Sequence, residues 1–436
     1  MLIYNTNYKL LVQQLNQIGF DNFQKITDLE IREFTEKDYL KRFQQIQTIY
    51  AHDNIILEGR FAPKKDMSKL VKLIDSIRKS SEKDLSLVGH FIKKKDIYND
   101  EIVFYRDKKL RFELKIMTNN MIRLLSKKEY RGLINGFDAA ANELHTKPEV
   151  FAPSFSKLRS LGYDNFTFHG GEDFIDLTSG IRYIYEIVEF LEFDNGNRIG
   201  HATAIGIDPK LWQKRVGKKL YITQGEYLDN LIFAYYLLQK ENKFNKIKIK
   251  TEEKIYKYCS KIYDNIYNIQ ELIEAWKLRK EDPEAYFESM DNKIVSQSIY
   301  CRYHTDKKVI EEYNKKIEFE TTFFTPKELK TIQNIVIKLL NKKSIIIESM
   351  LSSNKMISFY KDYKEHHISR WLLKSPKPIV VLATDDPGIF ATNLKNEYAH
   401  LYLILKDKLD NEEEVFEIIQ KLILNSKIYT FNRKDN

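Results

Sequence analysis

The chain has 436 residues, of which 43% are hydrophobic, so it is long enough to bury a large core as one elaborated domain or as two. It lacks a charged-then-apolar leader and a run of about 18 apolar residues, which argues against secretion and membrane spanning and favours the cytoplasm. The formal charge of +9 comes from 71 Lys and Arg against 62 Asp and Glu interspersed along the chain, a pattern typical of solvated helix faces rather than of a nucleic-acid surface.

The cysteine content restricts the kind of metal site that the chain can build. Cys259 and Cys301 are the only cysteines, and they lack the spacing of a CxxC pair. A disulfide framework and a thiolate zinc site are therefore not expected. Any metal would use nitrogen and oxygen ligands.

The first third of the chain predicts helices followed by a strand, a helix and a strand. Residues 1–80 show apolar residues at three- and four-residue spacing, which indicates a charged helical segment. The run Leu85–Ile92 has the pattern of a buried strand and is the first strand that we predict. An amphipathic helix over residues 112–125 and a strand over residues 132–138 follow, which is the rhythm of a βαβ unit.

The same alternation continues to the C-terminal part. A helix over residues 150–161 precedes a strand ending at His169, and a helix over residues 181–191 precedes a strand ending at His201. Asp208-Pro209 predicts another helix start, and residues 224–342 predict a long helical insertion whose last helix begins with the capping box Thr325-Pro-Lys-Glu328. Two further strands are expected over residues 344–349 and 378–385.

Strands that alternate with helices, each ending in polar residues, predict an α/β fold of the (β/α) barrel type with its active site at the C-terminal ends of the strands. A doubly wound open sheet is the alternative. We divide the chain into a helical N-terminal segment (1–80), a first barrel part (81–223), a helical insertion (224–342) and a closing barrel part with C-terminal helices (343–436).

Three predicted strands end in ionisable side chains. His169 and Glu172 follow one strand, His201 ends the next, and Asp385 and Asp386 follow the last. Imidazole and carboxylate suit a divalent metal such as zinc, so His169 and Asp385 are candidate ligands, and Glu172 is a candidate proton donor. Each of these residues by itself also fits a structural role, for example a helix cap at Asp385, but their combination favours a site.

Five motifs resemble those of the adenosine deaminase family, and they occur in the family's order. His169-Gly-Gly-Glu172 resembles its His-Ala-Gly-Glu, Arg198-Ile-Gly-His201 its Arg-Ile-Gly-His, and Thr384-Asp385-Asp386-Pro387 its Thr-Asp-Asp-Pro. With departures, the stretches 136–143 and 348–354 also resemble the family's Gly-Asp-Leu-Ala-Gly-Asp-Glu and Glu-x-Cys-Pro-x-Ser-Asn motifs. The resemblance covers about residues 85–405.

The resemblance implies a metal-dependent hydrolase barrel that deaminates adenine to hypoxanthine in a nucleoside or nucleotide. It implies that His169 and Asp385 bind Zn²⁺ and that Glu172 protonates ring N1. It further implies that His201 orients or deprotonates the metal-bound water, that Asp386 accepts a hydrogen bond from protonated N7, and that the backbone at Gly136 holds the ring near N3.

Finer features resemble one branch of the family, the large deaminase subunit of bacterial RADAR-type antiphage defence systems. These are Gly206-Ile-Asp-Pro, Gly225-Glu-Tyr-Leu-Asp-Asn and Pro387-Gly-Ile-Phe-Ala-Thr. This branch implies a role in antiviral defence, assembly into homo- or hetero-oligomers, and an ATPase defence subunit as a partner.

One element of the family is missing from the sequence. The family has a His-x-His pair on its first barrel strand, whereas the nine histidines of this chain include no pair spaced two apart. We therefore predict a barrel without its first strand, completed by a partner chain or upstream segment that carries His-x-His. The alternative is a catalytically inactive subunit that binds nucleotide or serves as a scaffold.

Overall fold

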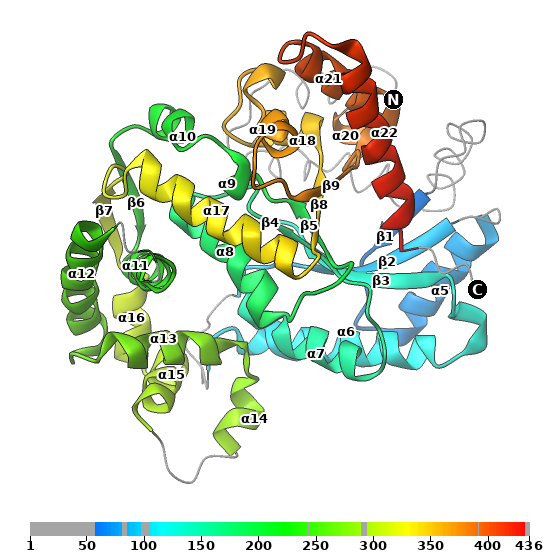
Figure 1. Ribbon diagram of the computed structural model, residues 1–436. Helices are drawn as coiled ribbons and strands as arrows, with labels where there is room; N and C mark the ends of the chain where they lie inside the picture. Colours follow the sequence, from blue (N-terminus) through cyan, green and yellow to red (C-terminus); the bar gives the residue numbers. More distant parts are fainter. Residues whose placement is uncertain are drawn as a thin grey trace, which may run out of the picture.

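The computed structural model describes residues 57–80, 85–96, 105–239, 241, 244–288, 294–390 and 392–431 (Figure 1). Most of the predicted N-terminal helical segment, residues 1–56, lies outside the described residues. No helix in these ranges is both long and apolar enough to cross a membrane.

Parallel strands form the centre of the molecule. They pair in the order β1-β2-β3 and β4-β5-β8-β9, and a single parallel bridge between Phe137 and Phe166 joins β3 to the segment that leads into β4. The strands are β1 (Leu57–Phe61), β2 (Leu85–Ile92), β3 (Ile134–Ala140), β4 (Thr167–Gly170), β5 (Arg198–His201), β8 (Ile346–Ser349) and β9 (Ile379–Leu382). The predicted strands at residues 85, 132, 169, 201, 344 and 378 are thus confirmed, within a few residues at their ends.

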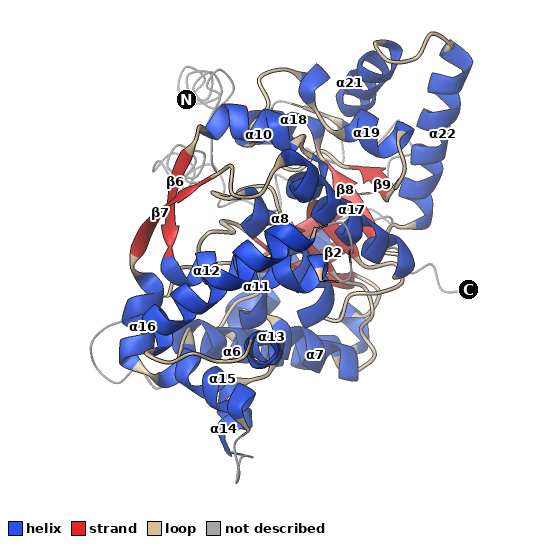
Figure 2. Ribbon diagram, turned by 60° about the vertical axis from the view of Figure 1, so that its left-hand side comes forward, coloured by secondary structure: helices blue, strands red, loops and turns tan. Residues whose placement is uncertain are grey.

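Helices cover the outside of these strands, as the alternating pattern predicts (Figures 1 and 2). Contacts join α8 to β4 and α22 to β9. The helices outside residues 219–320 are α5 (Met67–Ser80), α6 (Lys108–Leu125), α7 (Ala152–Ser160), α8 (Leu177–Phe190), α9 (Thr203–Gly206), α10 (Pro209–Val216), α17 (Pro326–Lys342), α18 (Leu351–Ile357), α19 (Ile368–Leu373), α20 (Pro387–Phe390), α21 (Leu394–Lys406) and α22 (Glu412–Ile428).

Local signals in the sequence account for several of these helices. The stripe Ile181, Ile184 and Val188 of α8 is fully buried, as its spacing predicts. The Asp208 carboxylate accepts from the backbone N–H of Lys210 at 2.8 Å and starts α10. The predicted capping box of α17 is formed, because Glu328 accepts from the backbone N–H of Thr325 at 2.7 Å.

The parallel strands curl, because inward side chains from distant strands meet. The guanidinium of Arg198 on β5 lies 2.7 Å from the carboxylate of Glu58 on β1. Arg60, also on β1, lies 3.1 Å from the carboxylate of Glu348 on β8. In a flat sheet, neighbouring strands lie about 4.8 Å apart, so strands that are not neighbours could not bring their side chains into contact. The curl agrees with the predicted barrel type, whereas closure into a complete barrel stays a prediction.

The strand β1 corrects the expectation that the sheet begins at Leu85. It lies in the segment expected to be helical and pairs with β2 in parallel, from Leu57 opposite Leu85 to Phe61 opposite Gly89. Its sequence, Leu57-Glu-Gly-Arg-Phe61, lacks the apolar pattern of a buried strand because the inward residues Glu58 and Arg60 are charged. Their ion pairs with other strands stabilise them inside the curl.

The predicted insertion, residues 224–342, holds helices, as expected, and the strand β7, whose antiparallel partner β6 directly precedes the insertion. The sequence does not reveal this strand pair. The elements of residues 219–320 are β6 (Lys219–Thr223), α11 (Gln224–Leu238), α12 (Asn245–Tyr263), α13 (Ile269–Lys277), α14 (Pro283–Glu288), α15 (Val295–Thr305), α16 (Lys307–Asn314) and β7 (Lys316–Glu320). β6 pairs with β7 at the edge of the molecule, apart from the central strands (Figure 2).

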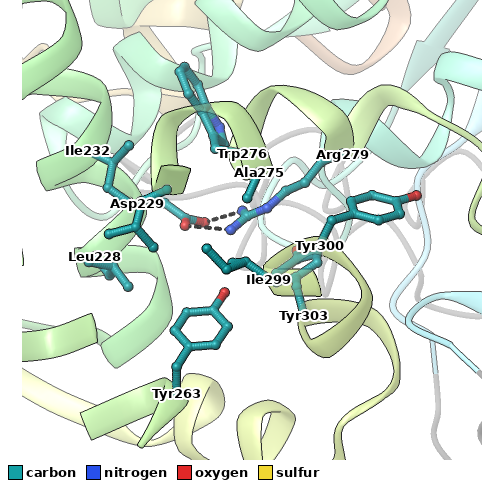
Figure 3. Close-up of a pocket in the computed structure, with 11 residues that line it drawn as sticks. Leu228, Asp229, Ile232, Tyr263, Ala275, Trp276, Arg279, Ile299, Tyr300 and Tyr303 are labelled. Carbon is teal, nitrogen blue, oxygen red and sulfur yellow. Dashed lines mark hydrogen bonds and ion pairs between the residues drawn. The ribbon is translucent and has the colours of Figure 1, made fainter. Parts of the chain in front are cut away.

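Buried ion pairs fix the insertion to the rest of the chain. Asp229 on α11 accepts two hydrogen bonds from the Arg279 guanidinium, at 2.6 and 2.9 Å (Figure 3). Lys147 lies 3.1 Å from the same carboxylate, and Arg182 on α8 pairs with Glu186 and Glu226. We call these six residues the Asp229 network. The adjacent cavity of about 10 Å³ has room for no more than one water molecule.

Candidate active site

The ends of three parallel strands bring Glu172, His201 and Asp385 together. One ligand atom from each lies within 4.8 Å of the other two. Glu172 follows β4, His201 ends β5 and Asp385 follows β9. Glu172 and His201 are buried at 5% and 1% exposure, whereas the Asp385 side chain is 23% exposed. The group therefore lies where the C-terminal ends of the strands meet and remains open on the Asp385 side.

The glycine turn after His169 sets the position of Glu172. Gly171 has φ +74°, and a Cβ there would lie 2.5 Å from the Ile184 side chain, so only glycine fits. The carboxylate of Glu143 accepts from the backbone N–H groups of Gly171 and Glu172, at 2.6 and 2.9 Å. This turn is therefore held from the end of β3, and the Glu172 side chain is directed towards β5 and β8.

Glu172 and His201 lie side by side. The Ser353 hydroxyl donates to Glu172 Oε1 at 2.9 Å, and the same oxygen lies 3.1 Å from His201 Nδ1. His201 Nδ1 also lies 2.8 Å from Asn354 Oδ1, and its Nε2 lies 3.9 Å from Asp385 Oδ2. Burial by itself lowers the pKa of His201, but the Glu172 and Asp385 carboxylates outweigh it and raise this pKa to about 10.

The backbone at these strand ends is strained. His201 and Ala202 have φ +66° and +50°, and Asp385 has φ +58°. Such left-handed conformations cost about 1–2 kcal/mol for residues other than glycine. Residues held in them cluster at functional sites, so strain at both His201 and Asp385 supports this group as the site.

His169 belongs to a neighbouring cluster. Its Nδ1 lies 3.2 Å from Asp138 Oδ1 on β3, and its ring centre lies 5.2 Å from that of His201. Burial lowers the pKa of His169, and the Asp138 carboxylate opposes this effect. Lys93 donates to the backbone carbonyl of His169, and burial lowers the pKa of Lys93 to about 8. His169 is thus next to the group of three residues but outside it.

The interior below His169 is occupied by a charged network that the sequence did not reveal. Asp138 is fully buried and pairs through Oδ2 with Arg60 of β1, and His90 Nδ1 lies 3.1 Å from the same oxygen. Although burial opposes ionisation, His169 and Arg60 hold the pKa of Asp138 well below its usual range. Arg60 also pairs with Glu348, so a permanent cation lies at this level of the strands.

The remaining predicted residues lie in different surroundings. Gly136 is inside β3, where a Cβ would lie 2.6 Å from the Phe431 ring and 3.0 Å from the Asn165 carbonyl, so it is packed rather than open. The left-handed residue at the end of β3 is Ala141, with φ +79°. Asp386 directly follows Asp385 and precedes α20, and its backbone carbonyl accepts from the N–H of Phe390 at 3.0 Å.

The donor set of Glu172, His201 and Asp385 fits a divalent metal. It offers one imidazole nitrogen and two carboxylate oxygens, which zinc accepts, and three protein ligands leave a position for water. The two carboxylates face a single imidazole inside this group, so the local charge also favours a cation. Sequence reasoning had assigned His169 and Asp385 as the ligands, and that assignment stays a prediction.

No protein-family model matches this sequence, and no curated protein is similar to it at a significant level. Solved structures are similar in fold. The Arabidopsis N6-mAMP deaminase is 16% identical over 98% of this chain and 84% of its own length, with a TM-score of 0.50. Arabidopsis ADAL complexed with IMP is 16% identical over 98% of this chain and 83% of its own, also at 0.50.

A third similar structure is the adenine deaminase from Arthrobacter aurescens, which is 10% identical over 96% of this chain and 82% of its own, with a TM-score of 0.49. At identities this low, the two likenesses with a TM-score of 0.50 establish a shared fold. It agrees with the α/β fold class predicted from the sequence.

Proposed function

We propose that this chain hydrolytically deaminates the adenine ring of a nucleoside or nucleotide. The observation that carries the proposal is the convergence of Glu172, His201 and Asp385 at three strand ends, within 4.8 Å of one another. The fold that the chain shares with an N6-mAMP deaminase supports it. Likeness to a protein crystallised with IMP favours a nucleotide as the substrate.

Each residue has a role that its contacts allow. Glu172, held by the Ser353 hydroxyl and by His201, would donate a proton to ring N1. His201, held at Nδ1 by Asn354, would orient the attacking water through Nε2. Asp386 would accept a hydrogen bond from protonated N7. Water replaces the amino group, and the products are ammonia and a hypoxanthine ring.

A divalent metal, zinc in our proposal, would be held by Asp385 and His169, and His201 Nε2, which lies 3.9 Å from Asp385, stays available to orient the water. When bound, such a metal lowers the pKa of a coordinated water towards neutrality. If the metal is instead held by Glu172, His201 and Asp385, Glu172 would not be free as the proton donor. Metal content of a Glu172 variant separates these two assignments.

A second candidate function is a nucleotide-binding or scaffolding subunit without catalysis, and β1 favours it. The resemblance requires a His-x-His pair on the first barrel strand, whereas β1 carries Glu58 and Arg60 in the corresponding inward positions. Because β1 already pairs with β2, a partner chain is not needed to supply a strand there. Within the first proposal, a partner would contribute histidines only.

The biological setting is also a proposal. The branch resemblance favours a role in antiphage defence, in an oligomer that includes an ATPase subunit. The insertion, residues 224–342 in our division, is the part of the chain that we propose for assembly.

The test is to purify the full chain, measure its bound zinc, and follow the ultraviolet shift of adenosine, AMP, ATP and dATP. The same assay is repeated with the product of the neighbouring gene. The proposal expects one bound metal and turnover of at least one of these compounds. Asp385→Ala should lose both the metal and the turnover.

Turnover that requires a partner bearing His-x-His would support a shared site. If neither preparation binds metal or converts any substrate, while nucleotide still binds, the second candidate replaces the first.

A further inference from the structure

A second cavity lies away from the strand ends. It has a volume of about 240 Å³ and is lined by residues of α6, of the stretch leading into and along α7, and of the start of α14. Figure 1 shows α14 next to α15 in the insertion, whereas α6 and α7 cover the central strands. The cavity therefore lies where the insertion meets the helix layer.

Arg111 of α6 lines this cavity and is only 7% exposed. Among the described residues, none of its three guanidinium nitrogens has a hydrogen-bond partner. The hydroxyl of Thr118, two turns further along α6 and also lining the cavity, lacks a partner as well. Buried charged groups are almost always paired, because desolvation without a partner costs several kcal/mol. Arg111 is therefore a buried cation whose guanidinium can bind an anion.

The nearby carboxylates do not supply that anion. Glu284 lies 3.3 Å from Lys115, and Asp282 accepts from the backbone N–H of Glu284 at 3.2 Å. Asp107 precedes α6, and its burial raises its pKa, although Arg111 opposes this shift. No hydrogen bond or ion pair joins any of these acids to Arg111 in the described part of the chain.

The rest of the lining indicates what kind of molecule fits. Lys115 and Lys157 also line the cavity, and with Arg111 they outnumber the carboxylates Asp282 and Glu284 by three to two, so the net charge of the lining favours an anion. The ring of Phe112 is 60% exposed, and Tyr105 is buried, so both an apolar and an aromatic wall are present. A volume of about 240 Å³ is below the roughly 300–1,000 Å³ of drug-sized sites, so the ligand is small.

We propose that this cavity binds a small oxyanionic ligand, a phosphate or carboxylate group on a compact molecule, with its oxygens on the Arg111 guanidinium. Guanidinium groups bind both anions through paired, charge-assisted hydrogen bonds. Bound there, the ligand would join α6 and α7 to α14 and so stabilise the contact between the insertion and the helix layer. This inference does not depend on the proposed deaminase activity.

The test compares the full chain with Arg111→Gln and with Arg123→Gln, a matched control at an exposed arginine of the same helix. Thermal unfolding and calorimetric titration are measured with inorganic phosphate and, separately, with acetate. We expect one or both anions to raise the unfolding midpoint of the wild type and of Arg123→Gln by a few degrees. Arg111→Gln should lose this shift and bind at least about tenfold more weakly.

A response to phosphate assigns a phosphorylated ligand, and a response to acetate alone assigns a carboxylate. Absence of a shift with both anions, or an equal shift in Arg111→Gln, overturns the proposal. Without added anion, Arg111→Gln should be at least as stable as the wild type, since it removes an unpaired buried charge. A clearly less stable variant would show that Arg111 has a structural partner, which also overturns the proposal.

Discussion

Two groups of buried charges in this molecule differ in their balance and in their backbone. In the Asp229 network, three cations face three carboxylates, and Arg279 and Lys147 hold the pKa of Asp229 well below its usual range although burial opposes them. In the strand-end group, two carboxylates face one imidazole, and His201 and Asp385 have left-handed backbones. Residues of the Asp229 network are not among those at positive φ.

The difference shows what separates a structural cluster from a candidate site. Balanced pairing of three cations with three carboxylates, on backbone without positive φ, stabilises the attachment of the insertion. Incomplete charge balance on strained strand ends leaves a group that can take a cation or exchange a proton. Burial alone does not separate the two, because Asp229 and His201 are both 1% exposed.

The strongest test of this contrast is Glu172→Gln. If Glu172 is the proton donor, turnover should fall by about 10²–10⁴-fold, since general acid catalysis contributes roughly that factor. Stability and bound metal should change little, because glutamine can still accept the hydrogen bond from Ser353. Kinetics, metal analysis and urea unfolding check this. Asp173→Asn changes the neighbouring carboxyl and serves as the control, which should keep the wild-type turnover. Unchanged turnover in Glu172→Gln would show that Glu172 has no role in the mechanism.

Asp229→Ala should act in the opposite way. Removing this carboxylate leaves Arg279 and Lys147 buried without their partner, which should cost about 3–5 kcal/mol of unfolding free energy. Urea or thermal unfolding measures the loss. The control is Asp407→Ala, in the exposed pair with Lys364, which should leave stability nearly unchanged. A small effect at Asp229 would contradict a structural role for the network.

Asp176 lies between the two regions, since it directly precedes α8 and its carboxylate accepts from Asn230 of α11 at 2.8 Å. Burial raises its pKa to about 7, above the value of 3.8 for an exposed aspartate. The folded state thus holds a proton that the unfolded state has lost, so stability should fall as the pH rises from about 4 to 7.

In Asp176→Asn this fall should disappear, a difference of up to about 4 kcal/mol across the interval. Urea unfolding at several pH values measures it. Parallel pH profiles for the variant and the wild type would show that Asp176 titrates normally.

The smallest expected effect concerns backbone strain. Ala141 has φ +79° and lies two residues before Glu143, which holds the Glu172 turn. Ala141→Gly should leave stability unchanged or raise it by up to about 1 kcal/mol, because glycine adopts this conformation without strain. Ala275→Gly in helix α13 should instead lower stability by about 0.5–1 kcal/mol or more. Equal effects at both positions would mean that Ala141 is not strained.

The sequence by itself determined the alternation of strands and helices and the residues at the strand ends. Continuous apolar runs such as Ile345 to Ile347 predict strands buried on both faces, and the structure confirms them. The capping pattern at Thr325 and the stripe on α8 were equally readable, because both depend on neighbours within one or two turns.

Only the tertiary structure decided which charges meet. Glu58 and Arg60 looked like residues of a solvated segment, yet they face Arg198 and Glu348 across the curl, some 140 and 288 positions away in sequence. The same holds for Asp138 beside His169. Strand ends are local, so the sequence identified their chemistry; the pairing of side chains depends on curvature and register, which long-range packing sets.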